Sequence, residues 1–172
     1  RSLNVAGIIS ASDAIYLVGK RAQLLMEKCT VGSHGLLAVK ASVLSIRESV
    51  DDTSINIACI NGPEETVLSG DIALIDTISE RLTAAGFKCM QLKVPFAFHS
   101  TQVDPILDEF EKLATSVQFH APTVPIVSTL LGRQLREGET VDPSYLRRHA
   151  REPVDFLGGI ISIQSAGLVN EK

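Results

Sequence analysis

The sequence predicts an α/β protein in which a β-α-β-β-α-β unit interrupts a larger α/β body. Two observations carry this prediction. Between residues 36 and 94, short apolar or alternating runs and two amphipathic segments follow one another in the order strand, helix, strand, strand, helix, strand. This is the split β-α-β order of ferredoxin-like folds. Helical and extended segments flank the unit on both sides, so we expect the body to comprise residues 1–35 and 95–172 and the ferredoxin-like subdomain to comprise residues 36–94.

Within the unit, the second helix has the clearest pattern. Ile75, Ile78 and Leu82 recur at helical spacing, and Gly86 is placed to end the helix. The predicted elements are strands at 35–41, 55–60, 65–69 and 88–94, helices at 43–50 and 72–85, a loop at 51–53 and a turn at 61–63.

The body has a less regular pattern. We expect a helix opened by Ser12 and Asp13 that ends near Lys28, a loop at 95–100, a helix at 105–117, a buried strand at 122–131, a turn or hairpin at 132–141, and helices at 143–149 and from 154 to 163. Apolar residues crowd both ends, at 3–9 and 156–161, whereas natural domains usually begin and end in polar linkers. We therefore expect the sequence to be a piece of a longer polypeptide.

Composition excludes several classes of protein. The 172 residues carry 16 Lys and Arg against 20 Asp and Glu, a net charge of −4, which argues against binding nucleic acid or an anionic membrane. No apolar run approaches the roughly 18 residues of a membrane span. Three distant cysteines without a CxxC spacing argue against a disulfide framework or a zinc site, and favour a reducing, cytoplasmic setting.

One histidine has the position of a catalytic group. His99 lies in a strand-to-helix loop after Pro95 and two aromatic residues, where rigid elements commonly hold reactive side chains. The alternative is a loop histidine that only bonds a backbone carbonyl. Ser100 is an unfavourable partner, because adjacent side chains in a turn rarely face each other, and no GxSxG occurs. Metal spacings such as HxxxH are absent around the other histidines, which are His34, His120 and His149.

Several segments resemble one enzyme family in the same order. Residues 3–21 resemble the helix after the nucleophile elbow of malonyl-CoA:acyl carrier protein transacylases, 58–70 their inserted subdomain, and 94–100 their catalytic histidine loop. Residues 103–107 and 145–156 continue the match. The sequence is most similar to the transacylase domain of iterative, non-reducing fungal-type polyketide synthases, over essentially the whole chain. The resemblance implies an α/β-hydrolase-like body with a ferredoxin-like insertion.

The resemblance also assigns roles to four residues. His99 would be the general base toward a serine hydroxyl and then the general acid toward the leaving thiol. Arg21, which by itself could be a surface arginine on a helix, would grip the malonyl carboxylate with its planar fork. Phe98 would crowd the α-carbon and favour malonyl over methylmalonyl. Ser128 would present a backbone carbonyl to the histidine.

The implied reaction transfers malonyl from malonyl-CoA to the phosphopantetheine thiol of an acyl carrier protein domain, with no bound cofactor or metal and with neighbouring polyketide synthase domains as partners. The family's GxSxG serine and one oxyanion amide would lie before Arg1, so we expect these residues alone to be inactive. Two alternatives remain: a non-catalytic module that docks a carrier protein, and a starter-unit transacylase. The match at Arg21 and Phe98 argues against the second, since a carboxylate clamp suits a dicarboxylic acyl group.

Overall fold

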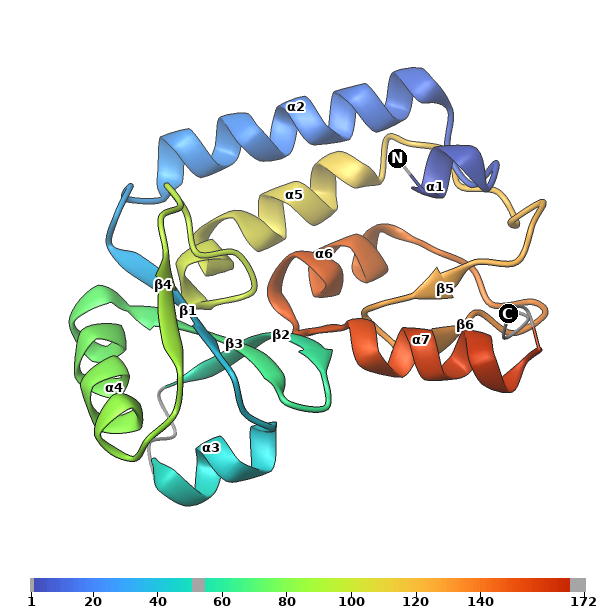
Figure 1. Cartoon of the computed structure of the whole chain (residues 1–172). Coiled ribbons are helices and arrows are strands. Elements are labelled where there is room, and N and C mark those ends of the chain that lie inside the picture. Colours follow the sequence, from blue (N-terminus) through green and yellow to red (C-terminus); the bar gives the residue numbers. More distant parts are fainter. Residues whose placement is uncertain (1, 51–54, 168–172) are drawn as a thin grey trace.

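Four strands of the β-α-β-β-α-β unit and one strand of the body form a five-stranded sheet (Figure 1). The computed structural model describes residues 2–50 and 55–167. The strand order is β4-β1-β3-β2-β7, and the first four strands pair antiparallel. Their bounds are His34–Val39 for β1, Asn56–Gly62 for β2, Glu65–Asp71 for β3 and Cys89–Leu92 for β4. The predicted β-α-β-β-α-β order is confirmed, and β3 separates β1 from β2 as in other split β-α-β units.

Two helices complete the unit. In α4 (Ile72–Ala84), Ile75, Ile78 and Leu82 are fully buried against Leu37 and Leu68 of the sheet. The spacing that predicts this helix is therefore the spacing of its buried face. The other helix, α3 (Val43–Ser49), begins at Ser42, whose hydroxyl accepts a hydrogen bond from the Ser45 backbone N–H. The loop expected at 51–53 lies outside the described residues.

The fifth strand comes from the body. β7 (Val154–Asp155) pairs parallel with β2 and leads directly into α7 (Phe156–Ser165). The helix expected from residue 154 therefore begins two residues later, because the Asp155 N–H bonds the Thr129 carbonyl and its carboxylate caps α7. The boundaries expected at 36 and 94 stay a prediction.

Helices dominate the rest of the body. They are α1 (Ser2–Val5), α2 (Ala11–Lys28), the 3₁₀ helix η1 (Thr101–Ile106), α5 (Leu107–Ala114) and α6 (Pro143–Arg151). In Figure 1, α2 and α5 run side by side, and buried residues such as Leu24 of α2 and Phe110 of α5 belong to one hydrophobic core. The helix expected at 105–117 is thus a 3₁₀ turn followed by a shorter α-helix.

The strand expected at 122–131 is mostly absent. Only Val127–Ser128 (β5) is extended and paired, with Arg133–Gln134 (β6). Pro122 and Pro125 have no N–H to donate to a ladder, which limits this segment to a short pairing. The turn or hairpin expected at 132–141 begins earlier in the structure. The turn that joins β5 to β6 spans residues 129–132 and ends at Gly132, which has a φ of 62°.

Candidate active site

The loop between β4 and η1 holds His99 in an unusual backbone conformation. Its φ is 61°, in the left-handed region that residues with a Cβ rarely adopt. The next residue, Ser100, is fully buried; its hydroxyl donates to the Ala97 carbonyl and accepts from the Gln102 N–H at the start of η1. Ser100 is therefore a capping residue, consistent with the expectation that it does not pair with His99.

The His99 ring is oriented by a backbone carbonyl. Its Nδ1 lies 2.8 Å from the carbonyl oxygen of Glu152. A carbonyl only accepts hydrogen bonds, so Nδ1 carries the proton and Nε2 is the basic nitrogen of the neutral ring. Burial lowers the pKa of His99, with smaller contributions from His149 and Arg21, while the bond to Glu152 opposes that shift. The ring is thus neutral and basic near pH 7.

The prediction that Ser128 supplies this carbonyl is wrong. The hydroxyl of Ser128 lies 2.7 Å from that of Tyr145 and accepts a hydrogen bond from the Leu131 N–H. Ser128 therefore links the β5–β6 hairpin to α6 through Tyr145. Glu152 takes the carbonyl role because it caps the end of α6. Its N–H bonds the Arg148 carbonyl, and its carboxylate pairs with the Arg148 guanidinium.

Arg21 lies over the ring of Phe98. Its Cζ is 5.0 Å from the ring centroid, a cation–π arrangement. Its Nε is buried and has no hydrogen-bond partner among the residues that the structure describes. Burial lowers the pKa of the guanidinium. A largely buried cation without an anionic partner is costly, which distinguishes Arg21 from a surface arginine and indicates a place for an anion.

A cavity of about 450 Å³ brings these groups together. Arg21, Ser128 and His149 all line it. His149 contacts His99 edge to face, with ring centroids 6.2 Å apart and planes at 79°, and it stacks on Tyr145 at 6.0 Å. All four predicted residues therefore lie at or beside this cavity.

Three neighbours of the site escape prediction from the sequence: Tyr145, His149 and Glu152. The first two are four residues apart in a helix that begins at Pro143, so helical spacing alone places them on one face. No such signal identifies Glu152, because its backbone carbonyl makes the contact.

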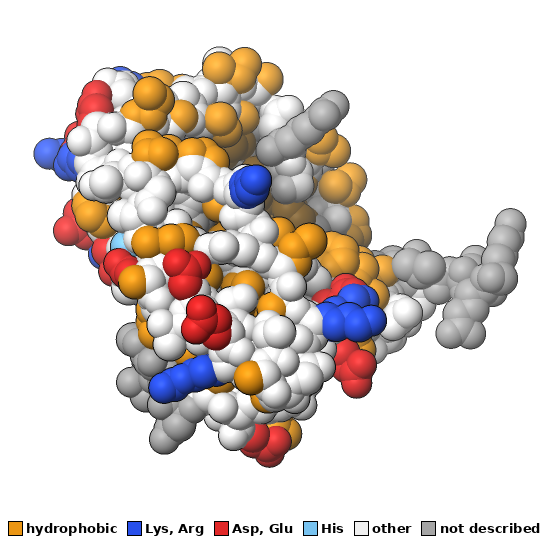
Figure 2. All heavy atoms as spheres, turned by 60° about the vertical axis from the view of Figure 1, so that its left-hand side comes forward, with side chains coloured by type: hydrophobic (Ala, Val, Ile, Leu, Met, Phe, Trp, Pro, Cys, Tyr) orange, Lys and Arg blue, Asp and Glu red, His pale blue; other side chains and the backbone are white. Residues whose placement is uncertain are grey.

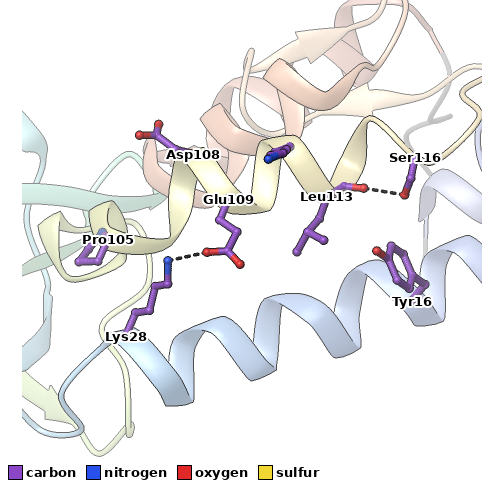
Figure 3. Close-up of a pocket in the computed structure, with 8 residues that line it drawn as sticks. Tyr16, Lys28, Pro105, Asp108, Glu109, Leu113 and Ser116 are labelled. Carbon is purple, nitrogen blue, oxygen red and sulfur yellow. Dashed lines mark hydrogen bonds and ion pairs between the residues drawn. The ribbon is translucent and has the colours of Figure 1, made fainter.

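A larger hollow of about 680 Å³ lies between α2 and α5 (Figure 3). Its lining residues are Tyr16, Lys28, Pro105, Asp108, Glu109, Lys112, Leu113 and Ser116. Lys28 and Glu109 point toward each other across it and form an ion pair. Among the described residues, the lining of this hollow has no histidine base beside a cation that lacks a partner. We therefore take the smaller cavity as the candidate active site.

Neither a metal site nor a membrane-spanning helix is found within residues 2–50 and 55–167. There, no group of three or more His, Cys, Asp or Glu side chains could hold a metal ion. Over the same ranges, no helix combines the length and apolar content that crossing a membrane requires.

The family follows from comparison with known proteins. Residues 1–169 match the model of the acyl transferase domain, and the chain belongs to this family. Its mixed α/β fold matches the acyltransferase domain from the second module of the salinomycin polyketide synthase, with a TM-score of 0.87 and 38% identity over 95% of this chain and 38% of that one. A malonyl CoA-acyl carrier protein transacylase from Clostridium perfringens has the same fold, with a TM-score of 0.87 at 22% identity over 96% of this chain and 54% of that one.

The more similar relatives are fungal polyketide synthases, which confirms the resemblance. The chain is 58% identical to the conidial pigment polyketide synthase PfmaE of Pestalotiopsis fici over 99% of its length. It is 52% identical to the bikaverin polyketide synthase bik1 of Gibberella fujikuroi over 98% of its length. In both comparisons the chain spans 8% of the relative.

Proposed function

We propose that these residues supply the general base and the acyl-selecting cation of a malonyl transferase. The acyl group would move from malonyl-CoA to the phosphopantetheine thiol of an acyl carrier protein. The observation that carries the proposal is the Arg21 guanidinium, whose buried Nε has no hydrogen-bond partner among the described residues, in a cavity whose wall contacts His99. A carboxylate at the end of the acyl group would pair with this cation.

His99 would act through Nε2. As a serine hydroxyl attacks the thioester carbonyl carbon, Nε2 takes the hydroxyl proton, and the imidazolium is stabilised by the Nδ1–H bond to the Glu152 carbonyl. When the carbon–sulfur bond breaks, Nε2–H protonates the coenzyme A thiolate and an acyl-serine ester remains. The carrier thiol then loses its proton to Nε2, attacks the ester, and the serine oxygen leaves with that proton.

The serine of this mechanism is not assigned to a residue of the chain. The 172 residues contain no GxSxG, and the buried Ser100 hydroxyl is used as a cap. We therefore place the nucleophile in an acyl transferase domain that contains these residues together with a GxSxG serine. This assembly is called the complete domain below.

The acyl group would be selected by Arg21 and Phe98 together. The guanidinium favours a carboxylate over a neutral acyl end, because an acyl group without charge leaves the cation unpaired. The Phe98 ring, which lies beneath the guanidinium, would narrow the space at the α-carbon. Excluding one methyl group in such a pocket contributes only about 1–3 kcal/mol, so Arg21 would be the stronger determinant.

The carrier protein is proposed as the partner. One solved neighbour is an acyl-carrier protein in complex with its malonyl-transacylase; it shares the fold at 21% identity, with a TM-score of 0.82. We propose that a carrier domain of the same polyketide synthase delivers its thiol to the His99 side of the cavity.

The test is a competition between malonyl-CoA and acetyl-CoA in the complete domain. In Arg21→Ala, malonyl transfer should fall and acetyl transfer should rise, which reverses selectivity. Arg21→Lys should recover only part of the malonyl preference, because an ammonium keeps the charge but not the fork. Intact-mass measurement of the acyl-enzyme gives both rates.

Two results would contradict the proposal. An unchanged malonyl-to-acetyl ratio in Arg21→Ala would remove Arg21 from the site, as expected for a surface arginine whose loss changes stability by about 0.5 kcal/mol or less. A wild-type complete domain that accepts acetyl-CoA as readily as malonyl-CoA would also overturn the assignment.

A further inference from the structure

We infer that Ser69 of β3 is a positioning residue for His99, so that the β-α-β-β-α-β unit takes part in acyl transfer. This inference rests on the proposed role of His99 as the base. The Ser69 hydroxyl donates to the His99 backbone carbonyl at 3.2 Å across the boundary between the unit and the body. Its side chain is fully buried, with 0% exposed, so water does not replace this bond.

The alternation of β3 directs Ser69 toward the catalytic loop. Successive side chains of a strand point to opposite faces of the sheet. Leu68 packs in the core of the unit, whereas Ser69 points to the other face and reaches the His99 loop. The Asn56 carbonyl, on the paired strand, is a second acceptor at 3.5 Å. One hydroxyl proton serves one acceptor at a time, and the His99 carbonyl is the nearer.

The backbone conformation of His99 explains why such a bond matters. Among the described residues, His99 is the one non-glycine residue with a positive φ. A residue with a Cβ keeps such a conformation only when its surroundings hold it there. The Glu152 carbonyl holds the imidazole from the body, and Ser69 holds the backbone carbonyl from the unit. Losing the second restraint allows the loop to relax and Nε2 to move from the serine.

The chemistry of the bond sets the kinetic expectation. A neutral hydroxyl on a backbone carbonyl contributes no charge to the cavity, and Ser69 does not line it. Malonyl-CoA should therefore bind as in the wild type, whereas the proton transfer depends on a distance that small displacements spoil. We expect Ser69→Ala to lower the acylation rate at saturating malonyl-CoA about five- to tenfold, with KM unchanged.

The chain offers a matched control on the same strand. Thr66 is 1% exposed, and its hydroxyl donates to the Ala41 carbonyl at 2.9 Å. Three residues from Ser69, it belongs to the opposite face of β3. Thr66→Val removes the same kind of buried hydrogen bond from the same strand. Both variants should lower the thermal unfolding midpoint of the complete domain by a few degrees, but only Ser69→Ala should slow acylation. Ser69→Cys, which keeps the size and a weak donor, should be intermediate in rate.

A spectroscopic readout separates this inference from the proposed function. In the wild type, ¹⁵N NMR of the imidazole should show the Nδ1–H tautomer, because Nδ1 donates to Glu152. Ser69→Ala should shift the ring toward the Nε2–H tautomer, whichever acyl group the enzyme uses, and Thr66→Val should not. If the wild type fails to transfer malonyl but this shift occurs, the proposed function is wrong and the positioning role stands. Wild-type acylation and tautomer in Ser69→Ala, or equal effects in Thr66→Val, would overturn the positioning role.

Discussion

The β-α-β-β-α-β unit and the body around it are built by different means. Among the described residues, the unit has four paired strands of four to seven residues each and a core in which nine residues are buried. The body has strands of two residues each, and its helices leave large apolar side chains exposed, among them Ile15, Val18 and Met26 of α2 and Ile161 of α7. Figure 2 shows hydrophobic side chains along the top of the molecule, where α2 lies in Figure 1.

This difference shows how the site is divided. The body supplies the cavity, which is lined by helices and by the β5 segment, together with Arg21 of α2 and the Glu152 carbonyl at the end of α6. The unit supplies a rigid sheet against which the His99 loop is fixed. The His99 loop therefore lies where the two regions meet: the unit binds the backbone carbonyl of His99, and the body binds its imidazole. Three sets of substitutions test this division, beginning with the one of largest effect.

The largest effect is expected at the contact of the two regions. In the complete domain, His99→Ala removes the proposed base, so acylation should fall by about 10²–10⁴-fold. The fold should survive, because a loop imidazole held by one carbonyl contributes little packing. Stopped acylation reactions and circular dichroism measure the two quantities. Parental transfer rates in a folded His99→Ala variant would show that another group is the base.

The stability contrast between the regions is the next test. Leu82→Ala, at a fully buried position of α4, should lower the free energy of unfolding by about 2–5 kcal/mol. Met26→Ala removes another large side chain, but on α2, where 78% of it is exposed, and should change that free energy by about 0.5 kcal/mol or less. Urea denaturation of both variants measures the contrast. A cost at Met26 near that at Leu82 would mean that the exposed face of α2 is covered in solution.

The same contrast explains what the sequence can predict. The unit is predictable element by element because its buried faces follow periods of 3.6 and 2, as at Ile75, Ile78 and Leu82. The body is less predictable. Residues 122–131 are apolar, but prolines and contacts with distant segments, such as the Thr123 N–H to the Ala6 carbonyl, replace strand pairing there.

The site shows a similar limit. The sequence nominates His99, Arg21 and Phe98 because side-chain identity in a motif carries the chemistry proposed for them. The hydrogen-bond partner of the His99 ring could not be predicted, because every residue has a backbone carbonyl. Which carbonyl faces the ring depends on where α6 ends, and in the structure it is that of Glu152. Nor does the sequence show that the Nε of Arg21 is buried and lacks a polar partner among the described residues, since that depends on how α2 packs over Phe98.

The smallest expected effect is a dependence of stability on pH. The pKa of His149 is lowered by burial and then by the charge of Arg21. Above the ordinary histidine pKa of about 6.5, both the folded and the unfolded chain hold this ring neutral. As the pH falls below that value, the unfolded chain binds a proton before the folded chain does, so stability decreases toward the lowered pKa.

His149→Gln should therefore flatten the loss of stability between about pH 6.5 and 5, while His120→Gln, at an exposed position of the body, serves as the control. Urea midpoints across this pH range measure both slopes. A slope in His149→Gln as steep as in the wild type would show that the ring is solvated in the folded chain and that Arg21 does not act on it.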